Sequence, residues 1–576
     1  MTLEYNGSAT IDLHRASGTT FLTMASSQQP LLRSLTSART RPTFKPLLFT
    51  LSIAAVLSLA GLVTHQLATT YDRLHLRRYP AKLCASSPRP ASCRAVISSG
   101  HGKGEALHPV SPRDVLHGIL RSSVPRLEAA VSAATGIRRG VGDPRERAAL
   151  ADCLELMDLS HLQLSDSSAA LSGGAFTDAK TWLSASLTNY DTCLDGLSEF
   201  ARSTMETHLK PLVEMASAAL AVLDAASSPR DDEILRPAWK KFPSWLPARD
   251  RRLLEADSVD AIKANAVVAL DGSGNFSTVQ AAVDSAPNKG KARYVIYVKQ
   301  GTYAENVNVG KSKTNLMIVG DGMNKTTITG SLNVVDGSTT FNSATLAAVG
   351  EGFILQDICI QNTAGPEKHQ AVALRVVADK SAINRCKIEA YQDTLYTHSL
   401  RQFYRDSIVS GTVDFIFGNA AVVFQNCSLV ARKPMSNQQN LVTAQGRTDP
   451  NQNTGTSVQN CRVVPSADLA PVKGTIPSYL GRPWKEYSRT VFLQSYLDDH
   501  IAPRGWLEWS GTFALDTLFY GEYSNQGPGA GTAGRVNWTG YHVITDPSVA
   551  QGFTVAQLIQ GGAWLQSTGV VFTEGL

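Results

Sequence analysis

The hydrophobic and polar positions follow three different patterns along the chain of 576 residues. Residues 47–63 are uncharged and largely apolar. Between about 80 and 228, apolar residues recur at helical spacing, as in AALADCLELMDLSHLQLSDSSAAL. After about 263 this periodicity disappears, and short β-rich runs such as YVIYV recur between Asn, Gly, Thr and Asp. The pattern therefore predicts an apolar N-terminal segment, an α-helical region and a β-rich region.

The apolar run predicts delivery to the secretory pathway. Basic residues precede it, so we expect an N-terminal leader over 1–46 and a signal anchor or signal sequence over 47–68. The uncharged run is at the lower edge of the length that spans a bilayer. Whether it is cleaved stays open, and both outcomes place the rest of the chain in the secretory lumen. Glycosylation sequons agree with this, at Asn275, Asn324, Asn426 and Asn537.

The helical region of 80–228 predicts an all-α four-helix bundle of antiparallel helices. Its four cysteines indicate two disulfides in a secreted protein. Cys84 and Cys93 are nine residues apart, which suits a short hairpin clip. Cys153 and Cys193 are forty residues apart, which suits two long neighbouring helices.

Residues 229–262 carry prolines and mixed charges, which is typical of a linker. Within the linker, Arg251, Arg252, Leu253 and Leu254 form a tetrad with two interpretations. It is a processing site for a protease, or it is a solvated basic turn.

The β-rich region of 263–576 repeats one phrase, in which a polar residue precedes Cys or Ser and a short aliphatic step. The phrase occurs around Cys359, Cys386, Ser407, Cys427 and Cys461, in steps of 27, 21, 20 and 34 residues. Self-similarity at about 20 residues or more is typical of a solenoid. Because the runs are β-rich, the sequence predicts an all-β right-handed parallel β-helix with one coil per repeat. A β-sandwich with chance similarity is the alternative.

Two aspartates occupy equivalent positions in successive repeats. Asp393 lies seven residues after Cys386, and Asp414 lies seven residues after Ser407. Coils stacked about 4.8 Å apart bring these carboxylates together. Two nearby carboxylates cannot both ionise at low cost, so the pair divides into a proton donor and an ionised base or nucleophile. The alternative is that one aspartate points to solvent or is neutralised by a basic residue.

Four further side chains are candidates for the same site. Gln370 and Gln392 carry neutral amides, which stabilise a developing oxyanion without adding charge. Arg482 is able to grip an ionised aspartate by two parallel hydrogen bonds. Trp484 offers a flat apolar face for a sugar ring. Each residue taken singly favours a structural interpretation, so the prediction depends on the set.

Composition and charge exclude several classes of function. Lys and Arg number 54 against 49 for Asp and Glu, and a net charge of +5 gives little support for nucleic-acid binding. None of the eight cysteines forms a CxxC pair, so no zinc site is expected. The sequence contains no P-loop, no dinucleotide fingerprint and no GxSxG elbow. No cofactor and no metal are therefore predicted.

Five motifs in order make the β-rich region recognisable. They are GTYAE at 301–305, QAVALR at 370–375, YQDTL at 391–395, GTVDFIFGN at 411–419 and LGRPW at 480–484. With the ending GGAWLQSTGVVFTEGL, they resemble the plant pectin methylesterases (pectinesterases) over 263–576. The helical region resembles the pectin methylesterase inhibitor domain. The resemblance implies a right-handed parallel β-helix that hydrolyses methyl esters of galacturonate units in homogalacturonan and releases methanol.

The resemblance also implies a role for each candidate residue. Asp414 is the expected nucleophile, and Asp393 the expected general acid and then base. Gln370 and Gln392 are expected to hold the oxyanion, while Arg482 orients Asp414 and keeps it ionised. Contacts to the sugar chain are expected from Thr340, Gln370, Arg482 and Trp484.

Partners and location follow from the same resemblance. The RRLL tetrad is similar to the place where two-domain precursors of this family are cut, which implies a subtilisin-like processing protease. Homogalacturonan and the chain's own inhibitor-like domain are the other expected partners, and no nucleic acid is expected. We expect a membrane-anchored precursor in the secretory pathway and then a cell-wall protein, with the N-terminal domain autoinhibitory.

One position departs from the family pattern, and two other functional classes stay open. Family members commonly carry a cysteine where this chain has Ser407, so Cys427 is free or differently paired, for example with Cys461. A non-enzymatic pectin-binding or inhibitor protein is the main alternative function. Another β-helical pectin enzyme, a lyase or a polygalacturonase, is the third reading, but the expected calcium carboxylates or catalytic histidine are not evident.

Overall fold

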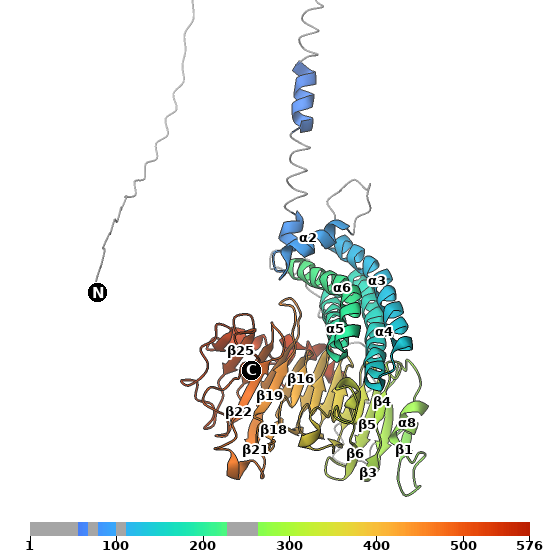
Figure 1. The fold of residues 1–576 in the computed structure, drawn as a ribbon, viewed down its shortest axis with the longest axis vertical. Helices are drawn as coiled ribbons and strands as arrows, with labels where there is room; N and C mark the ends of the chain where they lie inside the picture. The colour runs from blue at the N-terminus through green and yellow to red at the C-terminus, as the bar shows by residue number, and fades with distance from the viewer. Residues whose placement is uncertain (1–55, 67–78, 100–110, 227–262) are drawn as a thin grey trace, which may run out of the picture. The chain divides into compact units, whose positions relative to one another are not determined.

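The computed structural model describes residues 56–66, 79–99, 111–226 and 263–576 (Figure 1). Residues 56–66 are helical and are the described part of the predicted 47–68 anchor. Among the described residues, no helix combines the length and the apolar character needed to cross a bilayer. The predicted leader, the linker and the RRLL tetrad lie outside the described residues.

The helical region forms a bundle whose helix ends are set by local capping. Its helices are α2 (Pro90–Ser99), α3 (Pro112–Gly140), α4 (Pro144–Gly173), α5 (Phe176–Gly196) and α6 (Glu199–Ala226). Ser111 and Asp114 form a capping box at the start of α3. Asp143 accepts backbone hydrogen bonds at the start of α4, and Gly174 ends that helix with a φ of 79°. The four long helices α3 to α6 pack against one another, as the sequence predicts.

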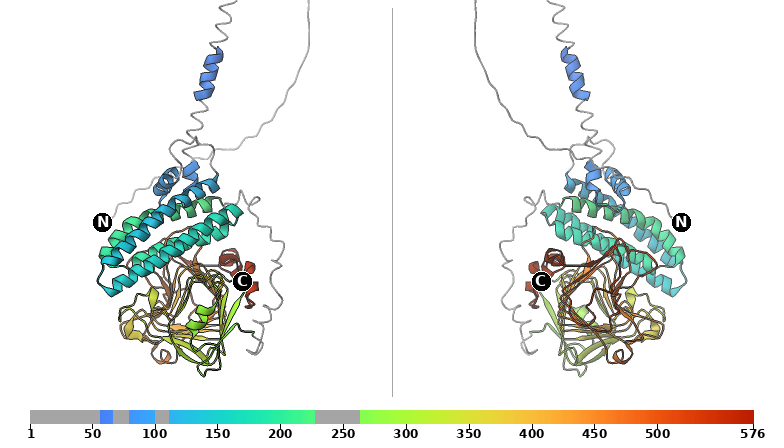
Figure 2. Two further views of the ribbon diagram at one scale, coloured as in Figure 1. Left: turned by 90° about the vertical axis from the view of Figure 1, so that its right-hand side faces the viewer. Right: turned by 90° about the vertical axis from the view of Figure 1, so that its left-hand side faces the viewer.

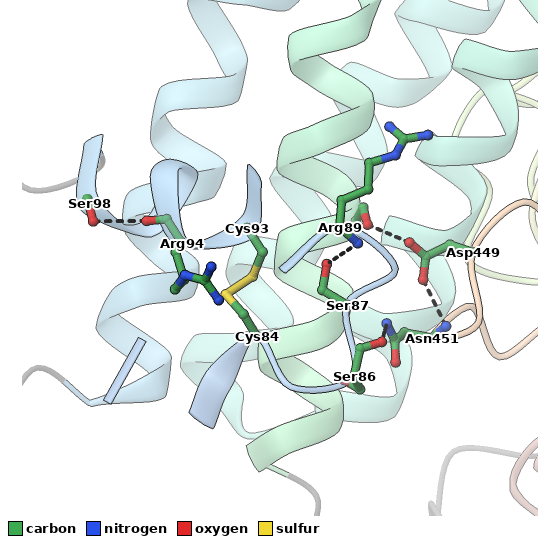
Figure 3. Close-up of a disulfide and its surroundings, with 10 residues drawn as sticks. Cys84, Ser86, Ser87, Arg89, Cys93, Arg94, Ser98, Asp449 and Asn451 are labelled. Atoms are coloured by element: carbon green, nitrogen blue, oxygen red, sulfur yellow. Dashed lines mark hydrogen bonds between the residues drawn. A yellow bond between two sulfur atoms is a disulfide. The ribbon is translucent and has the colours of Figure 1, made fainter. Parts of the chain in front are cut away.

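Two disulfides join the elements of the bundle. Cys84 bonds to Cys93 and ties the segment before α2 to that helix (Figure 3). Cys153 of α4 bonds to Cys193 of α5. Both pairings predicted from the cysteine spacing are confirmed.

The β-rich region coils into three sheets of parallel strands (Figures 1 and 2). The first sheet contains β1 (Ala266–Val268), β2 (Tyr294–Val298), β5 (Leu316–Gly320), β8 (Ile354–Gln356), β11 (Ser381–Asn384), β14 (Arg401–Arg405), β17 (Ala421–Gln425), β20 (Gly455–Gln459), β23 (Arg489–Leu493), β25 (Phe519–Tyr523) and β26 (Tyr541–Val543). The second contains β3 (Gly301–Ala304), β6 (Thr326–Gly330), β9 (Cys359–Asn362), β12 (Lys387–Glu389), β15 (Ile408–Gly411), β18 (Ser428–Ala431), β21 (Arg462–Pro465) and β24 (Tyr496–Leu497). The third contains β4 (Val307–Val309), β7 (Leu346–Ala348), β10 (Leu374–Val376), β13 (Leu395–Thr397), β16 (Ile416–Gly418), β19 (Asn440–Gln445) and β22 (Ser478–Pro483). Three sheets that the chain visits in turn make a parallel β-helix, so the predicted fold class is confirmed.

Aliphatic side chains stack coil upon coil inside the β-helix. In the second sheet, Ile360, Ile388, Val409, Leu429 and Val463 hold the same register on five successive strands. All five are fully buried. One apolar residue per coil therefore builds a continuous core, which is why short aliphatic steps recur in the sequence.

The polar turn before the second sheet explains the repeated Cys or Ser. Cys386, Ser407, Cys427 and Cys461 each stand directly before a strand of that sheet. The Ser407 hydroxyl accepts a hydrogen bond from the Cys386 amide at 3.1 Å, and the Cys461 sulfur accepts one from the Cys427 amide at 3.3 Å. Ser407 and Cys461 therefore each satisfy a backbone amide of the coil before them, a task that serine performs as well as cysteine.

The predicted repeat is wrong by one residue at Cys359. This residue is in register with Lys387, and Ile358 is the residue equivalent to Cys386. An aliphatic side chain fills the position there, and its neighbour Cys359 matches the repeated phrase instead.

The four cysteines of the β-helix, Cys359, Cys386, Cys427 and Cys461, carry free, buried thiols. The possible Cys427–Cys461 disulfide is therefore not formed in this structure.

Short helices cover the remaining surfaces of the β-helix. They are α8 (Val279–Ser285), α9 (Pro547–Gln551) and α10 (Val555–Leu558). Residues of α10 and Trp564 form an apolar cluster with the outer face of the first sheet. The helical bundle packs on the outer face of the third sheet instead, where residues of both form a single apolar cluster (Figure 2).

Candidate active site

Asp393 and Asp414 lie in the turns that enter β13 and β16, on neighbouring coils. Leu395 pairs with Ile416, which sets the two aspartates at the same position of successive coils. Both adopt the left-handed backbone conformation, with φ of 61° and 50°, so one turn geometry is repeated twice. The equivalence that the sequence predicts for this pair is therefore present in the structure.

The surroundings make the two carboxyl groups unequal. Asp393 is 8% exposed and Asp414 is 6% exposed. Burial and the charge of Asp414 raise the pKa of Asp393 well above its usual value, although Arg482 opposes the rise. Burial also raises the pKa of Asp414, but the hydrogen bonds and charge of Arg482 counteract this effect. Asp393 is therefore the better proton carrier and Asp414 the better carboxylate.

Arg482 on β22 grips Asp414 with both arms of its guanidinium. Its Nε donates to Oδ1 at 2.9 Å, and its Nη2 donates to Oδ2 at 2.6 Å. These are the two parallel hydrogen bonds that the sequence predicts for this residue. The guanidinium also lies 4.4 Å from the ring centre of Trp509, a neighbour that sequence reasoning missed because it follows a long segment without repeats.

One row of side chains, called the groove floor below, lies on the outer face of the third sheet. Arg375, Tyr396, Phe417, Ala444 and Arg482 hold the same register on successive strands. The Tyr396 and Phe417 rings are stacked at 4.2 Å. Flat aromatic faces in a row suit a chain of sugar rings. Sequence reasoning missed both aromatics, although each lies three residues after its aspartate.

The other predicted residues surround this groove. Trp484 meets Phe417 edge-on at 6.0 Å and is half-buried. Gln392 directly precedes Asp393, and its carbonyl accepts the Ala371 amide at 3.3 Å, so Gln370 stands one coil earlier. Both glutamine side chains are partly exposed.

Thr340, the last of the predicted site residues, lies near one end of the groove floor. Thr340 is half-buried directly before the short 3₁₀ helix η2 (Phe341–Ser343), and Phe341 lies 6.4 Å from Tyr396. Across the described ranges, no group of three or more His, Cys, Asp or Glu side chains is arranged to hold a metal ion.

Helices α4 and α5 lie over this groove. From α4, Asp152 accepts a hydrogen bond from Thr339 at 2.6 Å, and Glu155 lies 3.6 Å from Arg375. From α5, Thr192 is 3.0 Å from His398. Tyr396 and Phe417 are in the same apolar cluster as the core of the bundle. The aromatic floor is therefore buried by the helices.

Charged and polar contacts surround this apolar contact area. Lys485, next to Trp484, forms salt bridges of 2.9 Å with Asp191 and with Asp195 of α5. On α6, Ser217 donates to Asp449 at 2.5 Å.

The loop closed by the Cys84–Cys93 disulfide adds a further contact to the β-helix. The Ser86 carbonyl accepts a hydrogen bond from the Asn451 side chain at 3.0 Å (Figure 3). Asn451 follows shortly after Asp449, so one loop of the β-helix meets both α6 and the disulfide loop.

Two neighbouring carboxyl groups with unequal surroundings, beside a row of aromatic side chains, provide the groups that a hydrolase acting on a sugar polymer needs. A sequence model described as Pectinesterase matches residues 265–562. A second, described as plant invertase/pectin methylesterase inhibitor, matches residues 78–222. The chain therefore belongs to the pectinesterase family, carries an inhibitor-type helical domain, and is a carboxylic ester hydrolase.

Individual relatives agree with this assignment. Pectinesterase 2.1 of Solanum lycopersicum is 55% identical over 559 residues, which cover 96% of this chain and 100% of that protein. Pectinesterase/pectinesterase inhibitor of Ficus pumila var. awkeotsang is 54% identical over 530 residues, 90% of this chain and 95% of that protein. The solved structure of pectin methylesterase from carrot is 59% identical with a TM-score of 0.55, and it covers 56% of this chain and 100% of its own.

Proposed function

We propose that this pectinesterase removes methyl groups from homogalacturonan by an acyl-enzyme mechanism in which Asp414 is the nucleophile. The observation that carries the proposal is the bidentate grip of Arg482 on Asp414 beside Asp393, whose pKa is raised by burial and by the charge of Asp414. An oxygen of the Asp414 carboxylate attacks the ester carbonyl, and the carbonyl oxygen takes the negative charge. The side-chain amides of Gln370 and Gln392 hold this oxyanion.

Asp393 carries the proton through both halves of the reaction. When the tetrahedral species collapses, the ester C–O bond breaks and Asp393 protonates the departing methoxide, which leaves as methanol. An anhydride then joins Asp414 to the galacturonate carboxyl group. Asp393, now ionised, takes a proton from water, and the resulting hydroxide cleaves the anhydride. Cleavage releases the product as a galacturonic acid carboxyl group, which gives its proton to solvent water, and Asp414 is again a carboxylate and Asp393 again a protonated acid.

The mechanism is tested by methanol release from highly methylated pectin. The tested protein is the β-helix beginning at residue 261, compared with its Asp414→Asn and Asp393→Asn variants. Each variant is expected to lose about a thousandfold or more in kcat. The matched control is Asp284→Asn, which changes an exposed carboxylate on α8. Full activity of folded Asp414→Asn would contradict the nucleophile assignment. A folded β-helix without any release would favour the pectin-binding alternative.

The helical bundle is proposed to keep the precursor inactive, because α4 and α5 cover the groove floor. The full chain is then expected to release methanol far more slowly than the β-helix alone. Trp182→Ala, which removes a 3.3 Å hydrogen bond from α5 to Asp379, should raise the rate of the full chain. Glu128→Gln on the exposed face of α3 should not. Equal rates for the full chain and the β-helix would contradict autoinhibition.

The remaining proposals concern the route of the protein. We propose that 47–68 anchors the precursor in the secretory membrane and that a subtilisin-like protease cuts at Arg251–Leu254, which releases the enzyme into the cell wall. All four sequon asparagines of the β-helix are exposed, which supports N-glycosylation. Mass spectrometry of the secreted protein tests both points through its N-terminal residue and its glycopeptides. A secreted chain that keeps the helical bundle would contradict the processing site.

A further inference from the structure

Arg375 stands at one end of the groove floor, and Arg482 stands at the other. Four strand steps of about 4.8 Å separate the two residues along the row, or about 19 Å. The row between them carries Tyr396 and Phe417. The catalytic aspartates enter the strands of Tyr396 and Phe417, so a sugar chain that passes over these rings reaches Arg375 one or two strand steps away, or about 5–10 Å.

Two arginines of the β-helix each bind a carboxylate of the same domain. Arg482 holds Asp414, and Arg401 donates to Asp379 through two nitrogens, at 3.0 and 2.7 Å. These pairs satisfy the guanidinium whether or not another molecule is bound.

Arg375 differs from these two arginines. It is 2% exposed, and its Nε and Nη1 have no hydrogen-bond partner. Its guanidinium lies 3.4 Å from the ring centre of Phe341. Within the described residues, the carboxylates near it belong to α4, with Glu155 at 3.6 Å and Asp152 also acting on its charge. The β-helix thus supplies a stacked guanidinium and no anion of its own.

A guanidinium with free donors over an aromatic face is built to receive a carboxylate in two parallel hydrogen bonds. We propose that Arg375 binds the free carboxylate of a demethylated galacturonate unit in the groove, and that Glu155 stands in for this carboxylate in the precursor. The inference rests on the proposed homogalacturonan substrate. It adds a specificity that the catalytic residues do not provide, because a methyl ester has no charge to offer Arg375.

The product of the reaction is then also the ligand of this subsite. A chain that already carries carboxylates binds more tightly than a fully methylated one, provided that a carboxylate lies over Arg375. The enzyme should therefore work faster at low concentration on partly demethylated pectin than on fully methylated pectin.

The test uses the β-helix beginning at residue 261. The carrot enzyme shows that a β-helix of this family folds without the bundle, since all of that chain corresponds to 56% of this one. Fully demethylated polygalacturonate is added as a competitor of methanol release from highly methylated pectin. Arg375→Gln is expected to raise the inhibition constant of polygalacturonate at least tenfold, with a smaller change in KM for the methylated substrate. Arg375→Lys should raise this inhibition constant less than Arg375→Gln does, because lysine keeps the positive charge.

Two further variants separate this role from a structural one. Arg462→Gln removes an exposed arginine stacked on Tyr496 in the second sheet, away from the groove, and should leave competition unchanged. Ala347→Asp places a carboxylate beside Arg375 in the same row. It should weaken inhibition by polygalacturonate as much as Arg375→Gln does.

The outcomes distinguish this inference from the proposed function. Methanol release by the unchanged β-helix tests the esterase itself. Equal inhibition constants for Arg375→Gln and Arg462→Gln would overturn the inference while leaving the esterase intact. An equal rise in the inhibition constant of polygalacturonate and in KM for the methylated substrate would also overturn the inference, because it would indicate a structural role for Arg375. If Arg375→Gln does not fold, Ala347→Asp decides the matter.

Discussion

Asp152 makes the docking of the helical bundle depend on pH. Its carboxylate is on α4 and accepts hydrogen bonds from Thr339 and Asn342 of the β-helix. Burial raises its pKa from 3.8 to about 7, against the pull of Thr339 and Arg375, while Glu155 adds to the rise. Contacts with the β-helix accompany this burial, so an undocked bundle should return the pKa toward 3.8. Docking therefore takes up a proton.

The difference in the pKa of Asp152 between the docked and undocked states sets the sign and size of the pH dependence of docking. A carboxyl group whose pKa is raised in the docked state favours docking at low pH, and this contribution is lost as pH rises toward 7. A rise from 3.8 to about 7 corresponds to about 4 kcal/mol, of which each pH unit between these values removes about 1.4 kcal/mol, or a factor of ten. Burial and Asp191 also raise the pKa of Asp195, to about 6, despite Lys485. The titration of Asp195 therefore also favours docking at low pH.

The assay compares methanol release by the full chain with release by the β-helix alone at pH 5, 6 and 7. The ratio of the two rates cancels the titration of the active site and reports the undocked fraction. We expect Asp152 to raise the ratio about tenfold per pH unit as long as the docked form predominates, and Asp195 to add to the rise below pH 6. Asp152→Asn cannot titrate, so it should flatten this slope by about one power of ten per unit. Glu128→Gln on α3 should keep the slope.

Two results would refute this reasoning. A ratio that does not change with pH would mean that no proton is taken up on docking. An Asp152→Asn variant with the slope of the control would mean that other groups carry the titration. Because both rates are measured on the same substrate, a change in pectin charge with pH affects numerator and denominator alike.

Three other predictions concern the site and the bundle. Arg482→Gln removes the group that lowers the pKa of Asp414, so the acid limb of kcat/KM should move to higher pH, and an unmoved limb would contradict this electrostatic role. Cys153→Ser combined with Cys193→Ser should lower the unfolding free energy of the bundle by about 2–4 kcal/mol in denaturant titrations, while the β-helix transition stays in place. Phe417→Ala removes the ring stacked between neighbours in the groove and should raise KM about tenfold, about 1.4 kcal/mol, with little change in kcat, and an equal loss in both would argue against a binding role.

The repeat register was the most productive feature of the sequence. It predicted that Asp393 and Asp414 share a position on neighbouring coils, because a β-helix returns each coil to the same place. It failed at Cys359, where the coil has 28 residues and an aliphatic residue takes the place of the cysteine. Packing inside the coil accepts either residue type, so the letter alone does not fix the register.

The groove floor was missed for a different reason. Tyr396 and Phe417 have the same spacing from their aspartates, yet isolated aromatics in a β-rich sequence are expected in the core. Only the pairing of strands shows that they face outward with Arg375 in one row. Trp509 could not have been predicted, since it reaches Arg482 from a segment outside the repeats. Contacts between the bundle and the groove join residues far apart in the sequence and leave no local pattern.

The same row of side chains connects the proposed inhibition with the solubility of the full chain. A groove that stacks sugar rings must expose aromatics such as Tyr396 and Phe417, and an exposed apolar surface of this kind promotes association with other chains. In the precursor these rings are part of the bundle's own apolar cluster. Under the proposed autoinhibition, one contact would then both inhibit the enzyme and keep these rings out of water. A substitution that opens the groove early should increase activity and reduce the yield of soluble precursor together, since the same buried rings are released.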